Sequence, residues 1–352
     1  MRILVLGGTG AMGIHVTQLL AEAGHDVIVT SRRVRQSDIT GVSYAYGNAK
    51  EKSFLDGLLS ERWDAIIDFM IWSTSEFRTR VDDFLNASGQ YMFTSSYRVY
   101  ADSPVITEDS PRLLDVIDDS EYLATDEYAL AKARCENLLF SNKKKNWTII
   151  RPAVTYDGCG RFQLTVHEAD VWLWRALREI PVPVPRVMLT KQATMTWGGD
   201  VARMIALLIG NSKAMGETFT VSTAEHIAWQ KIADIYRGVI PMLRILDCNI
   251  EDFERAHGAI WQIRYDRMYD RIVDNTKILE VTGLKQDCLC TLRDGLTLQL
   301  RKYLSRNLDS RPVDFCRQAR FDKLVDSTLT FRYAASSGFS NFSKYLIHRF
   351  IK

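Results

Sequence analysis

A glycine-rich segment close to the first residue constrains the fold of this chain more than any other feature. The apolar run Arg2–Leu6 leads directly into Gly7-Gly8-Thr9-Gly10-Ala11-Met12-Gly13. Apolar residues then recur at helical spacing over residues 16–23, and a second apolar run occupies Val27–Thr30. This order predicts a strand, a tight turn, a helix and a second strand, which together form the first βαβ unit of a parallel sheet.

The three spaced glycines of the turn suit the binding of a dinucleotide. Gly7 permits the tight turn, Gly10 lets the backbone approach a pyrophosphate, and Gly13 allows the helix to pack closely on the strand. Amide groups at the start of the helix carry partial positive charge that attracts phosphate. A turn without a ligand is the alternative, but its position between a strand and an amphipathic helix favours a dinucleotide site. The residues of this turn assigned to that site are Gly7, Thr9, Gly10, Ala11, Met12 and Gly13.

The residues that follow the second strand indicate which dinucleotide binds. An acidic residue there would bind the ribose hydroxyls of NAD(H), but the chain has Ser31, Arg32 and Arg33 and no acid before Asp38. Guanidinium groups suit the 2′-phosphate of NADP(H), whereas two solvated loop charges are the alternative interpretation. We therefore expect NADP(H) to be favoured over NAD(H). Further expected cofactor contacts are Asn48, Met70 and Pro152.

Strands and helices are expected to alternate up to about residue 155. Apolar runs predict strands at Val42–Tyr46, Ala65–Phe69, Tyr91–Thr94 and Thr148–Ile150. Helical periodicity predicts helices at Lys50–Ser60, Glu76–Asn86 and Asp126–Ser141. The expected fold class is therefore α/β, with a Rossmann-type doubly wound parallel sheet and right-handed crossovers.

Beyond this dinucleotide-binding domain, residues 1–155, the pattern changes to helices mixed with short strands. We expect residues 193–211 to return to the first domain and residues 156–305 to form a smaller α+β substrate lobe. Residues 306–352 are expected to be a C-terminal extension of unknown role. An amphipathic helix for a membrane or a partner is one interpretation of its basic, aromatic end. We favour a helix that docks on the body of the protein.

A tyrosine, a lysine and a serine form a candidate acid–base set. Tyr128 and Lys132 lie one helical turn apart and share a face of their helix. Ser96 follows the strand Tyr91–Thr94, at the carboxyl edge where doubly wound sheets bind ligands. Each residue alone could be an ordinary surface or strand-end group. Together they favour proton transfer to or from a hydroxyl or carbonyl oxygen, because a nearby ammonium group favours the phenolate form of a tyrosine.

Taken in order, these motifs resemble those of the extended short-chain dehydrogenase/reductase superfamily, the group of NAD-dependent nucleotide-sugar epimerases, dehydratases and ketoreductases. The resemblance covers about residues 1–305 and depends on the order of the motifs, since a Tyr-x-x-x-Lys pair alone is common. Besides the glycines, the motifs are Ser96-x-x-Val99-Tyr100, Tyr128-x-x-x-Lys132, Arg151-Pro152, Trp197-Gly-Gly-Asp200-Val-Ala, Gly216–Val221 and Asp274-Asn-Thr-Lys277.

The resemblance implies an NAD(P)-dependent enzyme and assigns roles to its residues. Tyr128 would be the acid/base, Lys132 would assist it and hold the nicotinamide ribose, and Ser96 would bind the substrate oxygen. Arg161 and Arg271 would contact the substrate, with ordinary surface arginines as the alternative. The expected reaction is that of an NADP(H)-preferring reductase or epimerase acting on a carbonyl or secondary alcohol of a nucleotide-activated sugar, as in polysaccharide biosynthesis.

The chain departs from the pattern of the superfamily in one region, between the fourth and fifth strands. Only one short helix, Glu76–Asn86, is expected there, as in a shorter atypical branch that includes chloroplast RNA-associated proteins. Bulky residues at Phe69–Trp72 replace the usual small ones and are expected beside the cofactor. The alternative function is therefore that of a non-catalytic NADP(H)-binding or nucleic-acid-associated relative.

Composition argues against several other classes of protein. Lysine and arginine total 45 against 43 acidic residues, so the overall charge predicts no nucleic-acid partner. The six cysteines and six histidines lack ligand spacing, and no metal is expected. No apolar run approaches the roughly 20 residues of a transmembrane helix, and no secretory segment is recognised. We expect a cytoplasmic protein with a nucleotide-sugar substrate, and a homodimer is compatible with this interpretation.

Overall fold

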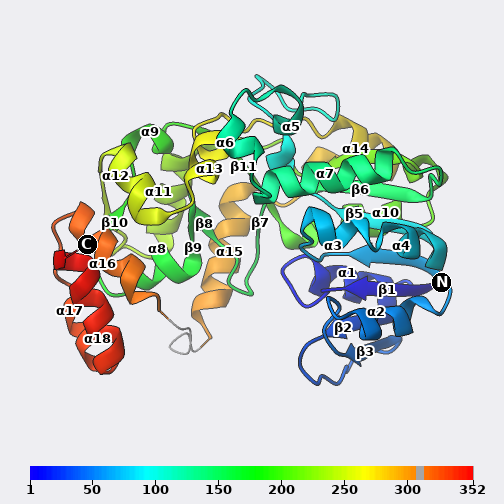
Figure 1. The fold of residues 1–352 in the computed structure, drawn as a ribbon, viewed down its shortest axis with the longest axis horizontal. Helices are drawn as coiled ribbons and strands as arrows, with labels where there is room; N and C mark the ends of the chain where they lie inside the picture. Colours follow the sequence, from blue (N-terminus) through cyan, green and yellow to red (C-terminus); the bar gives the residue numbers. More distant parts are fainter. Residues whose placement is uncertain (307–312, 352) are drawn as a thin grey trace. The chain divides into compact units, whose positions relative to one another are not determined.

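The computed structural model describes residues 1–306 and 313–351, which form two compact units (Figure 1). The first unit consists of Met1–Thr155, Thr194–Glu225 and Ile272–Leu292, and the second of Tyr156–Ala193, His226–Arg271 and Arg293–Lys352. Residues 212–225 and 272–292, which we expected in the substrate lobe, therefore belong to the first unit. The reason is local packing, because Ile278 of helix α14 (Thr276–Thr282) is fully buried in the core of that unit.

A seven-stranded parallel sheet forms the centre of the first unit, with the strand order β12-β6-β5-β4-β1-β2-β3. The chain leaves β1 toward one edge and later returns to pair β4 on the other side of β1, which is the reversal that defines a doubly wound sheet. The predicted α/β fold class is thus confirmed. The strands are β1 (Arg2–Leu6), β2 (Asp26–Ser31), β3 (Val42–Tyr46), β4 (Trp63–Asp68), β5 (Ser88–Thr94), β6 (Trp147–Pro152) and β12 (Glu217–Val221).

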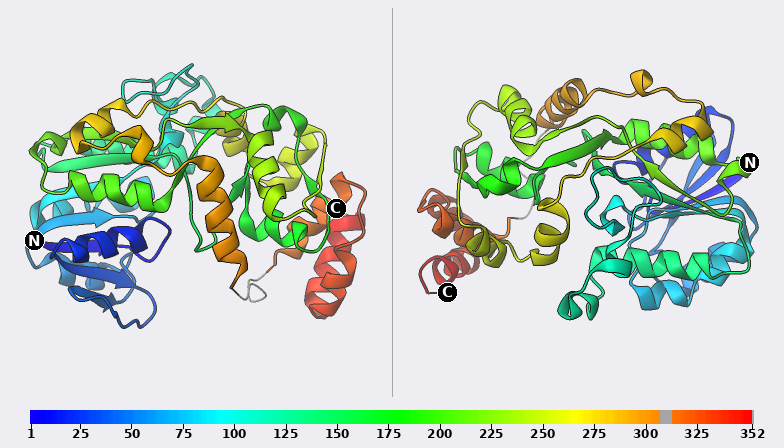
Figure 2. Two further views of the ribbon diagram at one scale, coloured as in Figure 1. Left: turned by 180° about the vertical axis from the view of Figure 1, so that it is seen from behind. Right: turned by 90° about the horizontal axis from the view of Figure 1, so that it is seen from above.

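Helices cover both faces of this sheet, as both views of Figure 2 show. Strand β1 is buried on both sides, with Ile3 and Val5 in one apolar core and Leu4 and Leu6 in the other. Such two-sided burial is typical of parallel sheets. Helices α1 (Gly13–Glu22), α10 (Gly198–Leu208) and α14 line the first core, and helices α2 (Lys52–Leu59), α4 (Val81–Ala87) and α7 (Tyr128–Phe140) line the second.

The connection between β4 and β5 contains two short helices, α3 (Thr74–Arg78) and α4, where we predicted one. Ser73 and Glu76 form a reciprocal capping box that begins α3. The break after Arg78 lets each helix direct an aromatic ring onto Tyr91 of the sheet. The centroid distances from Tyr91 are 6.3 Å to Phe77 of α3 and 4.8 Å to Phe84 of α4.

The second unit mixes helices with very short strands. Its helices include α8 (Ala169–Ala176), α9 (Arg186–Leu189), α11 (Trp229–Val239), α12 (Ile250–His257), α13 (Ile260–Gln262), α15 (Leu292–Leu304), α16 (Phe315–Leu324), α17 (Phe331–Ser336) and α18 (Phe339–Leu346). Its short strands include β8 (Gln163–Leu164), β9 (His167–Glu168), β10 (Val182–Pro183) and β14 (Ile245–Leu246). The last three helices, coloured orange to red in Figure 1, form a helical C-terminal region.

This C-terminal region is packed into the second unit. Phe315, Ala319, Ala334 and Tyr345 are buried together, and α16 lies against α12 and β10. Residues 307–312 and 352 of the predicted extension lie outside the described residues. The described part thus contains three helices rather than the single docked helix that we favoured.

Candidate functional site

The glycine turn connects β1 to α1 at the point where the strand order reverses. Gly7 has a φ of +69°, a conformation that favours glycine, and its amide donates to Thr30 Oγ1 at 3.0 Å. A Cβ on Gly13 would lie 2.4 Å from the carbonyl oxygen of Gly8, so close packing of helix on turn requires glycine there. A Cβ on Gly10 would meet no atom within 4 Å. The fold itself therefore explains Gly7 and Gly13, whereas Gly10 borders open space.

The start of α1 has the chemistry that a dinucleotide pyrophosphate requires. Helix α1 has ten residues, and no side chain caps its first turn. The earliest amides with main-chain partners in this turn are those of Ile14 and Val16, which donate to Gly10 and Met12. Preceding amides at a helix start are oriented toward the space before the helix and attract phosphate. The turn therefore fits a nicotinamide dinucleotide, with open space at Gly10 for its phosphates.

The loop after β2 presents the predicted arginines to solvent. Ser31 is buried, and its hydroxyl donates to the carbonyl oxygen of Arg33 at 2.7 Å and accepts from the amide of Arg33 at 3.2 Å. The side chains of Arg32 and Arg33 are exposed, and neither forms an ion pair with any acid in residues 1–306 or 313–351. The guanidinium groups of Arg32 and Arg33 are therefore available to an anion.

Asn48, another predicted cofactor contact, lies in the loop between β3 and α2, where it accepts a hydrogen bond from the amide of Lys50.

Lys132 joins helix α7 to the ends of two central strands. Its side chain is buried, and Nζ donates to the carbonyl oxygens of Thr94 at 2.6 Å and Met70 at 3.1 Å. Nζ also lies 5.9 Å from the ring centroid of Tyr128, which is the first residue of α7 and is partly exposed. The predicted pair thus lies at the carboxyl edge of the sheet, with its ammonium group fixed by two carbonyl groups.

Ser96 lies just beyond β5 and caps the short 3₁₀ turn η1 (Tyr97–Val99). Its Oγ accepts a hydrogen bond from the amide of Arg98 at 3.2 Å. The guanidinium carbon of Arg98 lies 5.2 Å from the ring centroid of Tyr128, and Nη2 forms a 2.6 Å ion pair with Glu127. Glu127 also caps the start of α7. Arg98 and Glu127 therefore position the Tyr128 end of α7 beside the Ser96 turn.

Arg98 and Glu127 were not identified from the sequence. The signal available was their proximity to the motif residues, since Arg98 is two residues after Ser96 and Glu127 immediately precedes Tyr128. Adjacency alone does not reveal a salt bridge between residues 29 positions apart.

A buried charged network lies behind the Ser96 turn. Glu136 of α7 accepts hydrogen bonds from the hydroxyl of Ser95 at 2.6 Å and from Nε and Nη2 of Arg151 at 2.8 and 2.7 Å. Arg112 also donates to Glu136. Burial disfavours the charge on Arg151, but the attraction of Glu136 outweighs it and raises the pKa of Arg151. The network holds β5, β6 and α7 together, and Pro152 ends β6 next to it.

We expected all the bulky residues after β4 to lie beside the cofactor at the glycine turn. The structure places only some of them there. Trp72 is buried in the core and its Nε1 donates to Asp68 Oδ2 at 2.7 Å, while Ile71 is 61% exposed. Asp68 also accepts from the hydroxyl of Tyr91, and burial raises the pKa of its carboxyl group. Met70 and Phe69 do reach the turn, with Met70 Sδ 3.1 Å and Phe69 Cβ 3.7 Å from where a Cβ on Gly7 would lie.

The two predicted substrate arginines belong to the second unit. Arg161 is exposed and lies 3.4 Å from Glu168. Arg271 is buried, and it contacts Asp266 at 2.9 Å and donates to the carbonyl oxygen of Tyr265. Arg267 contacts the same aspartate. Within the second unit, both predicted residues are thus already engaged by an acid.

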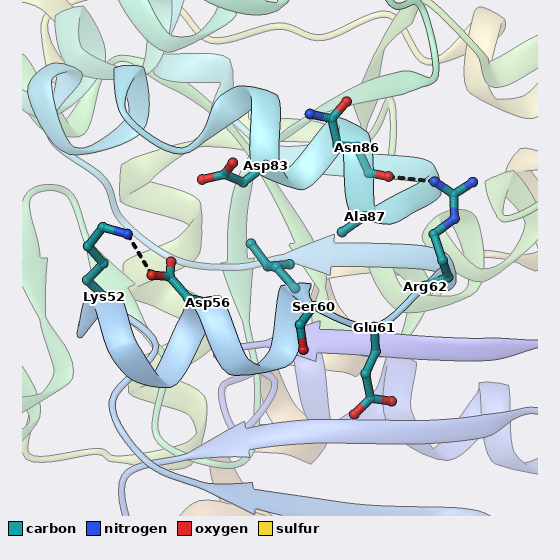
Figure 3. A pocket seen from close by; sticks show the side chains of 9 residues that line it. Lys52, Asp56, Ser60, Glu61, Arg62, Asp83, Asn86 and Ala87 are labelled. Atoms are coloured by element: carbon teal, nitrogen blue, oxygen red, sulfur yellow. Dashed lines mark hydrogen bonds and ion pairs between the residues drawn. The ribbon is translucent and has the colours of Figure 1, made fainter.

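A separate hollow of about 340 Å³ lies between α2 and α4, close to the start of β4 and β5 (Figure 3). It is at the opposite edge of the sheet from the glycine turn. Within it, Lys52 contacts Asp56 and Arg62 donates to the carbonyl oxygen of Asn86, while Glu61 pairs with Arg2. We assign no ligand to it.

Residues 1–306 and 313–351 contain no group of three or more potential metal ligands. None of their helices is both long enough and apolar enough to cross a membrane.

Comparisons with known proteins are consistent with this geometry. The model of the NAD dependent epimerase/dehydratase family matches residues 3–221. The chloroplast stem-loop binding protein of 41 kDa b from Arabidopsis thaliana is 24% identical over 335 residues, which cover 89% of this chain and 82% of that protein.

Two solved structures show the same fold at low sequence identity. MoeE5 in complex with UDP-glucuronic acid and NAD has a TM-score of 0.65 and 16% identity, over 87% of this chain and 99% of that one. TunA, an NAD dependent NDP-hexosamine 5,6-dehydratase involved in tunicamycin biosynthesis, has a TM-score of 0.64 and 17% identity, over 88% and 99% of the two chains.

Proposed function

The chain belongs to the NAD dependent epimerase/dehydratase family of extended short-chain dehydrogenases/reductases, and we propose that it is an NADP(H)-preferring reductase or epimerase of nucleotide-activated sugars. The observation that carries the proposal is the position of Tyr128 and Lys132, at the same sheet edge and in the same unit as the glycine turn. The substrate class is supported by the UDP-glucuronic acid in MoeE5 and by the NDP-hexosamine dehydratase activity of TunA.

In the proposed reaction, Tyr128 transfers the proton of the substrate hydroxyl through its Oη. A bound nicotinamide dinucleotide supplies or accepts the hydride. Two carbonyl groups hold the ammonium group of Lys132 5.9 Å from the ring centroid of Tyr128, on the same helix face as the proposed proton donor. The hydroxyl of Ser96 already accepts a backbone hydrogen bond, so its proton is left to donate to the substrate oxygen.

The same groups serve both candidate reactions. In a reduction, Tyr128 protonates the oxygen of a keto group. In an epimerisation, Tyr128 first removes the proton of a carbinol and later returns a proton after the keto intermediate has turned its other face. Cofactor consumption distinguishes the two, because a reductase consumes NADPH with substrate and an epimerase regenerates its cofactor.

The test of this mechanism is Tyr128→Phe, assayed on a panel of nucleotide sugars and keto-sugars. Loss of general acid–base catalysis should lower kcat/KM about 10²- to 10⁴-fold, with NADPH affinity retained. Tyr46→Phe, at an exposed tyrosine of β3 in the same unit, is the matched control. Unchanged turnover of every substrate by Tyr128→Phe would refute the assigned role.

The proposed cofactor site is tested by a pair of glycine substitutions. Gly10→Ala places its methyl group in open space, so it should leave the free energy of unfolding unchanged to within about 0.5 kcal/mol and weaken NADPH binding at least about tenfold. Gly13→Ala would clash with backbone and should cost about 1–3 kcal/mol of stability. Full NADPH affinity in Gly10→Ala would contradict the site, and isothermal titration measures it.

The preference for NADP(H) depends on Arg32 and Arg33, whose exposed guanidinium groups have no acidic partner within the described ranges. The double variant Arg32→Ala/Arg33→Ala should weaken NADPH binding about tenfold, or about 1.4 kcal/mol, and spare NADH. Arg35→Ala, at another exposed arginine of the same loop, is the control. Equal losses for both cofactors would exclude the preference.

A second candidate function is a non-catalytic, nucleic-acid-associated role. The observation in its favour is the similarity to the chloroplast stem-loop binding protein over 89% of this chain. Binding of an RNA stem-loop, measured by electrophoretic mobility shift, together with no turnover of any nucleotide sugar by the unmodified protein, would favour it over the enzyme.

A further inference from the structure

The end of the second unit carries a row of exposed apolar side chains. Helix α18 continues into the π-helical turn η5 (Ile347–Ile351). The side chains of Phe339, Ile347, Phe350 and Ile351 are 86%, 40%, 62% and 79% exposed. We call these four residues the terminal apolar row. So much exposed aromatic and aliphatic surface on one short segment marks an interaction site rather than scattered surface residues.

The opposite face of the same helix is anchored, which fixes the outward direction of the row. Tyr345 is fully buried and its hydroxyl donates to Asp322 at 2.8 Å. Phe342 packs on Phe331 with ring centroids 5.1 Å apart. Arg349, on the anchored side, contacts Asp326 at 3.3 Å. The row is therefore held away from the core by contacts on the reverse face.

The charge of this region is strongly one-sided, although that of the whole chain is nearly balanced. The sequence from Ser327 to Lys352 contains no aspartate or glutamate, while Arg332, Lys344, Arg349 and Lys352 are basic. Arg332 and Lys344 are exposed. The exposed Asp326 precedes this segment and is paired with Arg349, so Arg332 and Lys344 are left as its exposed basic side chains. An apolar row on such a segment is electrostatically complementary to an anionic surface.

We infer that α18 and η5 dock the protein on an anionic lipid surface, with the terminal apolar row among the acyl chains and Arg332 and Lys344 at the headgroups. A second copy of this chain fits less well, because two basic faces would repel each other. Nucleic acid fits less well because two of the four exposed residues are isoleucines, and bases stack on aromatic rings. This inference does not depend on the proposed reaction.

The experiment is flotation of the full chain with phosphatidylcholine vesicles that contain or lack phosphatidylserine. The chain should float with the anionic vesicles and bind the neutral ones at least about tenfold more weakly, since each Lys or Arg near an anionic surface contributes about fivefold. Phe339→Ser/Phe350→Ser/Ile351→Ser should lower binding at least about tenfold through loss of buried apolar area. Arg332→Gln/Lys344→Gln should abolish the preference for anionic vesicles.

Leu298→Ser is the matched control, because Leu298 is 63% exposed on α15 and lies outside the acid-free segment. It should bind vesicles like the unmodified chain. The inference is overturned if the chain does not float, if neutral and anionic vesicles bind equally, or if the triple variant floats normally. It is also overturned if the triple substitution converts a dimer to a monomer in sedimentation, or abolishes binding of single-stranded RNA, without changing flotation.

Discussion

Two buried ion pairs between an arginine and a carboxylate, one taken from each unit, differ in what they connect. In the first unit, Arg151 and Glu136 are 15 residues apart, and their network includes Ser95, next to Ser96. In the second, Arg175 and Asp322 are 147 residues apart and contact at 2.8 Å. One pair supports the proposed reaction centre, and the other joins the C-terminal helices to α8.

The electrostatics of the two arginines also differ. Both are penalised by burial, but attraction to Glu136 outweighs the penalty and raises the pKa of Arg151. At Arg175 the cost of burying the charge is larger than the attraction of Asp322, so the pKa of Arg175 is lowered. The second pair is therefore poorly compensated, so removal of its carboxylate should have the greater effect.

Asp322→Ala should cause the largest loss of stability. Asp322 accepts from Arg175, from the hydroxyl of Thr330 at 2.9 Å and from that of Tyr345 at 2.8 Å. Its removal leaves a buried arginine without its counter-ion and should cost about 3–5 kcal/mol. Chemical denaturation measures the loss, and proteolysis should become faster within residues 313–351. Asp326→Asn, at an exposed carboxylate, is the control; equal effects of the two variants would contradict the argument.

Glu136→Gln should have a smaller effect on stability and a visible one on catalysis. A glutamine still accepts a hydrogen bond, and Arg151 keeps the hydroxyl oxygen of Tyr100 as a partner at 2.8 Å. We expect a loss of about 2–3 kcal/mol and a lower kcat, because Ser95 loses its carboxylate acceptor beside Ser96. Asp115→Asn, at the exposed partner of Arg112, is the comparison. If Glu136→Gln cost more than Asp322→Ala in denaturation experiments, the ranking of the two pairs would be wrong.

Acidification should destabilise the second unit through two of its histidines. Burial lowers the pKa of His167 to about 4 and that of His257 to about 2, from an ordinary value of 6.5. Both are neutral in the folded state, so the unfolded chain binds more protons as the pH falls below 6.5, and stability decreases toward pH 4. Each histidine contributes at most about 1.4 kcal/mol per pH unit.

His257→Phe tests this prediction by removing one of the two groups. Phe253 and Phe321 already flank His257, with centroids 5.6 and 5.9 Å away, so a phenyl ring suits the site. The variant should lose less stability than the unmodified chain between pH 6.5 and 4.5 in denaturation experiments. His226→Phe, at an exposed histidine, should keep the original slope. Identical slopes for all three proteins would show that His257 does not contribute.

Features formed by residues that are close together in the sequence were predictable, because local conformational preferences determine them. The strand, the glycine turn and the helix at residues 2–22 follow from apolar periodicity and from the conformational freedom of glycine, and Tyr128 and Lys132 share a helix face because of their spacing. The confirmed α/β fold class follows from the alternation of such elements. None of these inferences required knowledge of which distant residues meet.

Contacts between distant residues were decided by the tertiary structure alone. The break between α3 and α4, the return of residues 272–292 to the first unit, and the Arg98–Glu127 pair beside Tyr128 depend on packing that spacing does not encode. The clearest case is Arg175 and Asp322, two ordinary charges in the sequence. Their pairing is determined by burial, because a charge removed from water must find its partner wherever the folded chain places one. The sequence by itself thus determined the elements and the motif residues, and the tertiary structure decided how distant charges and helices hold them in place.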